Sequence, residues 1–361
     1  MANTGTFKES LSLIPEALKW AEGQDIEELH DFFMDNPQMP MYAFASGGSY
    51  SSVDYAALLY ETYKGMAKAL TPLSMSSVSD DALKSAKILI LTSDGQGLDE
   101  NYVTQRAKIN PENTCAVVKI EDENNSVVKT LRRKAGARWF VYDWLTLHGE
   151  PFIATIDTVC KFGLFYKALT NDGNISSKLT VDLSADKCFS YAPKVEGDIP
   201  SLGNIRNFIV LYNGWSRPVA MDFESKMVES GIASVQLCDY RNFCHGRFIF
   251  LSKHLEDSAL VLFLTPREQK FVNDLIFKRI SWRNETIDVF PLNTPILKIE
   301  TELNSPLASI DLLIKMSVCF NEIAKANEDE PCDPKNPGKI DKRFPKHTSF
   351  TNLKKMGPLG S

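Results

Sequence analysis

The sequence predicts an α/β protein built from two doubly wound parallel-sheet halves, each with three layers in the order helix, sheet, helix. The first observation is that short apolar runs alternate with helix-length segments, which is typical of a parallel sheet covered on both faces. The second is that this alternation restarts midway along the chain. The third is that 361 residues are enough for two domains of ordinary size.

In the first half, each predicted strand is a short apolar run, and longer segments with helical spacing lie between the runs. The predicted strands are residues 41–45, 87–91, 114–118 and 138–141. The predicted helices are residues 51–69, 98–109 and 150–169.

Residues 191–204 interrupt this pattern. They are polar and contain both Pro and Gly, so we expect an interdomain linker there. The run 259–264 is entirely apolar, which indicates a central strand of a second parallel sheet. After the linker, strands are predicted at 207–212, 234–237 and 259–264, and helices at 217–229, 266–280 and 306–326.

These patterns predict the domain organisation. The first half, with an N-terminal helix, spans 1–190, and the second half spans 205–327. From about residue 328 the chain is rich in Pro and charged residues, and composition alone favours a disordered tail over 328–356. Residues 357–361, Gly-Pro-Leu-Gly-Ser, look like a cloning linker.

Composition and charge exclude several classes of function. The formal net charge is −6, so the chain builds no strong basic field that would attract nucleic acid. Seven cysteines without a Cys-x-x-Cys pair argue for a reducing compartment and against disulfides or structural zinc. No apolar run reaches about 18 residues, and the N-terminus lacks the features of a secretory signal. We therefore expect a cytoplasmic protein with no membrane or nucleic-acid partner, no metal and no cofactor.

Each half opens with a strand that ends in a loop of small residues, at 46–49 and at 213–216. In the first loop, Gly47 and Gly48 would let backbone N–H groups approach a ligand, and the following helix offers its positive N-terminus. Ser49 adds a hydroxyl donor. The simpler interpretation of this loop is a tight strand-to-helix turn.

A second candidate loop, 92–97, follows the strand predicted at 87–91. Thr92, Ser93 and Gln96 are polar groups that could hold an anion at a helix start. Asp94 does not fit that interpretation, because a carboxylate repels phosphate. Asp94 would instead suit sugar hydroxyls, or it would cap the following helix.

The first half carries a resemblance to a known family. Residues 45–61, ASGGSYSSVDYAALLYE, resemble the opening of a sugar isomerase (SIS) domain. Residues 92–97 fall where that family has its Ser/Thr-rich phosphate loop. Residues 150–155 resemble the Glu-containing segment that leads into a later helix of the family.

The second half matches as well. Residues 218–229 resemble the catalytic helix of the isomerase half of glucosamine-6-phosphate synthase, and 242–246 resemble its Glu-Leu-Lys-His-Gly segment. Residues 336–342 resemble its C-terminal tail with the catalytic lysine. The matches keep their order over about residues 10–342, so the chain resembles a double-SIS protein related to sugar-phosphate deaminases and deglycases.

This resemblance implies roles for individual residues. Glu229 falls on the carboxylate that shuttles a proton between C1 and C2 of a sugar, and Lys226 falls on the helical lysine near the substrate. His245 falls on the histidine that opens the sugar ring from the neighbouring subunit, and Lys342 falls on the tail lysine that closes over the ligand. The expected substrate-binding residues are Gly47, Gly48, Ser49, Thr92, Ser93, Asp94, Gln96 and Thr155.

Physical chemistry is compatible with these roles but leaves alternatives open. Lys226 and Glu229 are spaced i, i+3, so they are expected to share a helix face, where a carboxylate can exchange a carbon-bound proton. Without the resemblance, an ordinary surface ion pair is the simpler interpretation. A histidine side chain can act as both acid and base, which suits ring opening by His245, although a lone loop histidine is more often structural.

The sequence therefore predicts an enzyme that isomerises an aldose and a ketose, or deaminates or deglycates a sugar amine, by a glutamate proton shuttle. A sugar or amino sugar is the expected ligand, and a homodimer with a site shared between chains is the expected assembly. Because Asp94 and Gly97 replace phosphate-holding hydroxyls, we expect a preference for a neutral ligand end. The alternatives are a non-catalytic SIS module that binds a sugar or nucleotide-like ligand, and a subunit of a larger assembly.

Overall fold

The computed structural model describes residues 6–92, 98–119, 125–143, 153–192, 201–276, 279–282, 285–288 and 294–331. The chain forms two compact units, which we name the β1 unit and the β7 unit after the strand beside which the order of each sheet reverses. The described residues of the β1 unit lie within 19–145 and 160–174, and those of the β7 unit lie within 1–18, 146–159 and 175–335. The domain boundaries near residues 190 and 205 stay a prediction.

The β1 unit is built on a five-stranded parallel sheet with the order β2-β1-β3-β4-β5. The strands are β1 (Met41–Phe44), β2 (Ala67–Leu70), β3 (Lys87–Thr92), β4 (Thr114–Val118) and β5 (Arg138–Val141). Every residue of β3 and β4 is buried, as expected for central strands covered on both faces. Because β1 lies between β2 and β3, the strand order reverses beside it.

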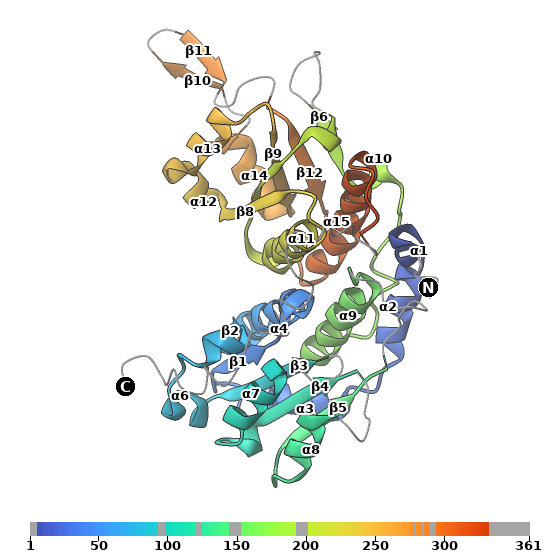
Figure 1. Cartoon of the computed structure of the whole chain (residues 1–361), viewed down its shortest axis with the longest axis vertical. Coiled ribbons are helices and arrows are strands. Elements are labelled where there is room, and N and C mark those ends of the chain that lie inside the picture. The colour runs from blue at the N-terminus through green and yellow to red at the C-terminus, as the bar shows by residue number, and fades with distance from the viewer. Residues whose placement is uncertain are drawn as a thin grey trace. The chain divides into compact units, whose positions relative to one another are not determined.

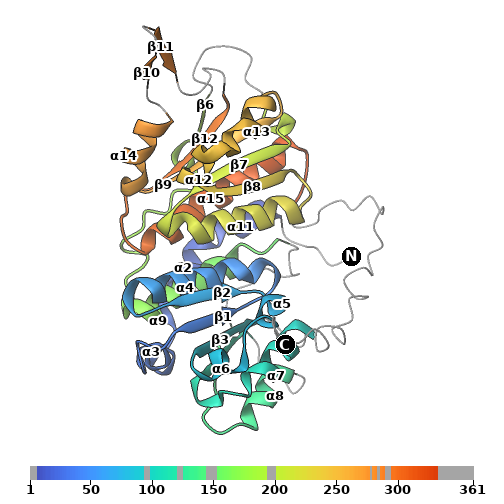
Figure 2. The ribbon, with the colours of Figure 1, turned by 90° about the vertical axis from the view of Figure 1, so that its left-hand side faces the viewer.

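Helices cover both faces of this sheet (Figure 2). On one face, Tyr55 of α4 stacks on Phe162 of α9 with ring centroids 4.4 Å apart, and Phe33 of α3 packs edge-on against Phe165 of α9. On the other face, α5 to α8 form a core with β3 and β4. The helices are α3 (Glu27–Met34), α4 (Tyr50–Tyr63), α5 (Pro72–Met75), α6 (Asp80–Lys84), α7 (Leu98–Ala107), α8 (Ser126–Arg132) and α9 (Ile156–Thr170).

The β7 unit contains a second five-stranded sheet with the order β6-β12-β9-β7-β8. Four strands are parallel, and β6 pairs antiparallel with β12 at one edge. The strands are β6 (Ser190–Ala192), β7 (Asn207–Tyr212), β8 (Ser234–Asp239), β9 (Ser258–Leu264) and β12 (Ile296–Glu300). The parallel strands follow the same doubly wound order as in the β1 unit, so the predicted fold class is confirmed.

Helices also cover both faces of the second sheet (Figure 1). One face carries α11 (Arg217–Glu229) and α15 (Leu307–Ala326), which pack against each other. The other carries α12 (Tyr240–Asn242), α13 (Phe248–Lys253) and α14 (Pro266–Leu275), which form a core with β7 to β9. Among the described residues, no helix is both long and apolar enough to cross a membrane.

Three further α-helices belong to the described part of the chain. They are α1 (Phe7–Ser12), α2 (Ile14–Gly23) and α10 (Ala185–Cys188). Phe7 of α1 packs edge-on against Phe320 of α15 with centroids 5.1 Å apart, and its backbone N–H donates to Glu330. The N-terminal helix is thereby fixed to the β7 unit.

Several predicted helix boundaries are wrong. The helix predicted over 51–69 ends at Tyr63, and residues 67–70 form the edge strand β2. At the turn between them, Gly65 lies so near the Pro37 carbonyl that a Cβ would approach its oxygen to 3.3 Å. The helix predicted over 266–280 ends at Leu275, and an antiparallel hairpin follows, formed by β10 (Arg279–Trp282) and β11 (Glu285–Asp288).

Two further expectations need correction. The predicted linker 191–204 begins inside β6, so its first residues belong to the second sheet; residues 193–200 lie outside the described part of the chain. The helix predicted over 150–169 begins at Ile156, with residues 150–152 outside the described part. Edge strands such as β2 and β6 are short, and their pairing with β1 and β12 defines them more than their own apolar pattern.

Candidate functional site

The loop after β1 lies at the carboxyl edge of the first sheet, beside the reversal of strand order. In open α/β sheets this position is where ligands bind. Residues Gly47–Ser49 form a 3-10 turn that leads directly into α4. Gly47 has φ +55°, and an added Cβ would meet no atom within 4 Å, so backbone conformation rather than space favours glycine there.

A buried lysine reaches this loop. Lys161 of α9 is 1% exposed, and its Nζ donates a 2.8 Å hydrogen bond to Ser49 Oγ. An ammonium group and a helix N-terminus in the same place favour an anionic or acceptor-rich ligand. Sequence reasoning missed Lys161, because a single lysine within an apolar helix carries no motif. The sequence did contain one indication of its burial, because Lys161 has apolar neighbours in Val159-Cys160-Lys161-Phe162.

Other candidate residues of the β1 unit lie near the same edge. Thr92 ends β3, the strand next to β1, and is buried. Ser46 precedes the 3-10 turn, and its hydroxyl donates to Glu100 of α7 at 3.2 Å. The predicted ligand residues Ser93, Asp94 and Gln96 lie outside the described residues.

In the β7 unit, Lys226 pairs with Asp222 and not with Glu229, so the surface ion pair given above as the simpler interpretation is wrong. Its Nζ lies 2.7 Å from the carboxylate of Asp222, one turn earlier on α11, and both side chains are at most 4% exposed. The ammonium also donates to the carbonyl of Ala154 at 3.2 Å. Positions i and i+4 place Lys226 and Asp222 on the buried side of α11, and this packing overrides the i, i+3 relation to Glu229.

Glu229 is exposed at the last position of α11. Its Oε1 accepts a 2.5 Å hydrogen bond from Ser225 Oγ. Burial, and to a smaller extent the charge of Glu229, raises the pKa of Glu224 on the same helix. The end of α11 therefore presents a solvent-accessible carboxylate near a second, partly buried carboxyl group that sequence reasoning did not single out.

Thr155 and His245 have contrasting environments. Thr155 is 1% exposed, and its hydroxyl has no hydrogen-bond partner among the described residues. It follows Ala154, whose carbonyl accepts from Lys226. His245 is exposed at a kink in the turn Phe243–Arg247, where the backbone of His245 and Gly246 is not helical and Gly246 has φ +107°. Lys342 lies outside the described residues.

One group of residues has the composition of a metal site. Ligand atoms of His254, Glu256 and Asp257 lie within 4.8 Å of one another. The His254 ring stacks on Phe250, and the Asp257 carboxylate accepts from Asn207 and Ser258. These contacts account for the positions of His254 and Asp257, and we assign no metal there.

Comparison with solved structures identifies related folds. The C-terminal domain of glucosamine-fructose-6-phosphate aminotransferase from Francisella tularensis superposes with a TM-score of 0.59 and 13% identity, over 93% of this chain and 99% of that one. Tagatose-6-phosphate ketose/aldose isomerase from Escherichia coli superposes with a TM-score of 0.61 and 14% identity, over 93% of this chain and 98% of that one. Glucosamine-6-phosphate deaminase from Thermotoga maritima superposes with a TM-score of 0.55 and 13% identity, over 89% of this chain and 97% of that one. At these identities the similarity establishes the fold alone. No protein-family model matches the chain, and no curated protein matches it.

Proposed function

The chain has the fold of the SIS-domain phosphosugar isomerases, and on that premise we propose that it is an enzyme acting on a sugar or amino sugar. The observation that carries the proposal is the buried Lys161 bonded to Ser49 in the glycine loop after β1. Ammonium, hydroxyl and helix N-terminus together form a binding arrangement for an acceptor-rich ligand.

The proposed reaction is aldose–ketose isomerisation, or deamination or deglycation of a sugar amine. His245 opens the sugar ring. The Glu229 carboxylate then takes the proton from C2 of the open-chain aldose and returns it to C1, while the hydroxyl proton of O2 passes to O1, which gives the ketose with no net gain or loss of protons. Lys342 closes over the ligand. In the deaminating or deglycating variant, the amine nitrogen leaves and water supplies the oxygen of the carbonyl.

We also propose that the enzyme is a homodimer in which the partner subunit supplies a histidine to the site. Two features support this assignment. His245 is exposed and makes no hydrogen bond to any described residue, so its ring nitrogens are available. The same turn continues into α13, where Phe248 and Ile249 are 44% and 49% exposed, as suits a surface that a second chain covers.

Two features of the β1 unit act in opposite directions on the charge of the ligand. Asp94 disfavours a phosphate, which is the basis of the preference predicted for a neutral ligand end. Lys161 provides a positive charge at Ser49 and favours a phosphate. The affinities for fructose 6-phosphate and for fructose are compared in the natural protein and in Lys161→Met. This comparison shows whether Asp94 or Lys161 dominates the preference for the charge of the ligand.

A decisive test of the enzyme follows the carbon-bound proton directly. The protein is incubated in D₂O with a panel of sugar phosphates, sugars and amino sugars, and NMR follows deuterium entering at C1 or C2. The natural protein should catalyse this exchange, and Glu229→Gln should slow it at least about 100-fold because Gln cannot accept the proton. Calorimetry should show nearly unchanged binding by this variant. Glu256→Gln removes an exposed carboxylate of the same unit and should behave as the natural protein.

A second function is favoured by one observation. Glu229 is exposed and bonded to Ser225, while the nearby ammonium of Lys226 is bonded to Asp222. This arrangement suits a non-catalytic module that binds a sugar and reports it to a partner. Saturable sugar binding with no deuterium incorporation for any ligand of the panel would contradict the enzyme and support this module.

A further inference from the structure

The second sheet repeats the binding geometry of the first sheet, at a place that the proposed function does not use. β7 lies between β8 and β9, as β1 lies between β2 and β3. The loop after β7 forms a 3-10 turn that starts at Gly214 with φ +50°, matching Gly47. A pocket of about 360 Å³ opens at this carboxyl edge, lined by residues after β7, after β8 and on α14. Pockets of this size at this edge of an α/β sheet are where small ligands bind.

The two carboxylates that line the pocket are already engaged as hydrogen-bond acceptors. Glu268 is buried, and it accepts from the Asn213 side-chain amide at 3.0 Å and from both the backbone N–H and the hydroxyl of Thr265. Asp239 accepts from the backbone N–H groups of Arg241 and Asn242, each at 2.8 Å, and from the Asn242 side chain. These bonds hold the pocket wall in place and leave little acceptor capacity for a ligand.

Donors, in contrast, remain available. The guanidinium groups of Arg241 and Arg267 are exposed and make no hydrogen bond or ion pair with any described residue. Asn213 uses one amide proton on Glu268, and its second proton has no partner in the described chain. Arg267 also lies in the first turn of α14, whose N-terminus carries partial positive charge. A pocket with free donors and occupied acceptors selects a ligand rich in acceptor oxygens.

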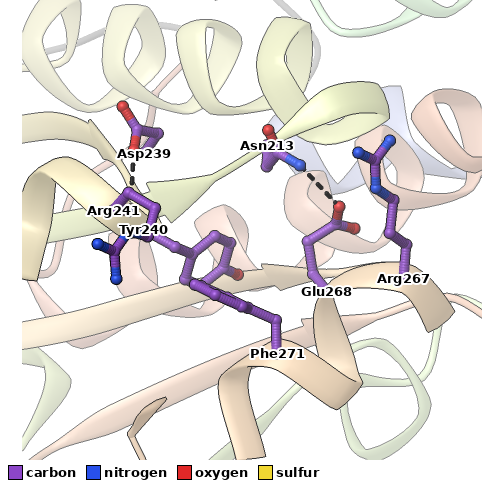
Figure 3. Close-up of a pocket in the computed structure, with 7 residues that line it drawn as sticks. All are labelled: Asn213, Asp239, Tyr240, Arg241, Arg267, Glu268 and Phe271. Carbon is purple, nitrogen blue, oxygen red and sulfur yellow. Dashed lines mark hydrogen bonds between the residues drawn. The ribbon is translucent and has the colours of Figure 1, made fainter. Parts of the chain in front are cut away.

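The middle of the pocket is aromatic (Figure 3). Tyr240 is buried, and its hydroxyl donates to the Phe263 carbonyl at 2.8 Å, so its ring is fixed. Phe271 packs edge-on against that ring with centroids 6.1 Å apart, yet it remains 38% exposed at the pocket. Arg241 and Arg267 lie at opposite ends, with the two rings between them. The body of a small molecule can therefore cover Phe271 while its ends meet the arginines.

We propose that this pocket is a second ligand site of the chain, specific for a small phosphate ester. Arg267 and the N-terminus of α14 hold the phosphate, because a planar guanidinium forms paired bonds to phosphate oxygens. Tyr240 and Phe271 contact the body of the ligand, and Arg241 bonds an acceptor group at its other end. The site is separate from the Ser49 loop, so the chain is expected to bind two ligands.

The test uses inorganic phosphate as the minimal probe and fructose 6-phosphate as the ester, in calorimetry. All measurements are made on Ser49→Ala as well as on the natural protein, so that binding at the first loop is recognised. In the Ser49→Ala protein, Arg267→Gln should lower the affinity for both probes at least about tenfold, which is the effect of losing one hydrogen bond to a charged group. Arg241→Gln should lower the affinity for the ester more than it lowers the affinity for phosphate. Raised salt should weaken both probes.

A matched control is available on the same helix. Lys270 is an exposed cation of α14 that does not line the pocket, so Lys270→Gln should leave both affinities unchanged. Melting temperatures confirm that each variant folds. The proposal is overturned if Ser49→Ala alone abolishes all phosphate binding, if Arg267→Gln binds phosphate as its parent does, or if neither probe binds.

Discussion

At the scale of single residues, the Lys226–Asp222 pair shows how a residue expected to act in catalysis is held by the fold. Both groups are buried and 2.7 Å apart. Removing one partner leaves the other charge buried without its counterion, and this is more destabilising than removing both. The pair thus stabilises the position of α11, which ends at the proposed base Glu229.

Asp222→Ala should lower the free energy of unfolding by about 3–5 kcal/mol, measured by urea denaturation. The double change Asp222→Leu, Lys226→Met should be less destabilising than Asp222→Ala alone. Glu229→Gln, a change at an exposed position, should alter stability by less than about 0.5 kcal/mol. If the single and the double change lower the free energy of unfolding equally, loss of the counterion is not what destabilises the protein.

Lys87 is a second buried ammonium, in the β1 unit. It is 1% exposed, and its Nζ donates to the carbonyls of Phe32 and Phe33 at the end of α3, at 2.5 and 3.1 Å. Its ammonium lies 5.2 Å from the centre of the Phe32 ring. Burial lowers the pKa of Lys87 from 10.5 to about 8.

The lowered pKa of Lys87 predicts a pH dependence of stability. Between pH 8 and 10.5 the unfolded chain binds more protons at this lysine than the folded chain does, so Lys87 contributes a rise of the free energy of unfolding with pH. The Lys87→Met variant should lack this rise. Burial also raises the pKa of the Cys115 and Cys319 thiols, and raises that of Tyr60 to about 12, which lowers the stability of both proteins as pH rises. The measured quantity is therefore the difference in free energy of unfolding between the natural protein and Lys87→Met, which should grow from pH 8 to pH 10. Parallel stability curves for the two proteins would contradict the assignment.

At the scale of elements, the two strand–turn–helix openings are the clearest sign of duplication. Ser46–Ser49 and Asn213–Ser216 share a glycine with positive φ at the second position and lead directly into α4 and α11. The turn orients the first backbone N–H groups of each helix toward the carboxyl edge of its sheet. An L-residue at the glycine position would strain that geometry.

Gly47→Ala and Gly214→Ala should each lower the free energy of unfolding by about 1–2 kcal/mol, because both residues occupy the left-handed region. Gly48→Ala is the matched control, since an added Cβ there meets no atom within 4 Å and its φ is not positive. It should change stability by less than about 0.5 kcal/mol. Thermal and urea unfolding measure the three variants. Tolerance of alanine at position 47 would mean that the loop readily adopts another backbone conformation.

At the scale of the whole molecule, the proposed assembly can be measured directly. Gel filtration with light scattering should give twice the mass of one chain, because the proposed site takes a histidine from the partner subunit. Changing Phe248 and Ile249 of α13 together to Ser and Thr should shift the protein toward the monomer, since both side chains are exposed in one chain. Changing exposed Leu73 of α5 to Ser is the control and should leave the dimer intact. A monomer at all concentrations would remove the basis for His245 acting in a neighbouring site.

The sequence by itself determined the architecture and the positions of the glycine-containing turns after β1 and β7. The apolar run at 259–264 became the fully buried strand β9, and the alternation of strands and helices gave two doubly wound sheets. The loop glycines and helix α11 at 217–229 were also predictable, because they depend on local backbone conformation and helical spacing. Strand pairing at the edges was not predictable, and the edge strands β2 and β6 and the β10–β11 hairpin were missed. The sequence analysis also missed β12, which lies inside the second sheet between β6 and β9.

Only the tertiary structure decided which charged residues meet. Lys161 contacts Ser49 across 112 positions of sequence, and Lys226 is paired with Asp222 because packing of α11 against α15 buries that side of the helix. Helical spacing allowed either Asp222 or Glu229 as the partner of Lys226. The physical reason is that sequence spacing fixes which side chains share a face, whereas burial decides which of them must neutralise one another.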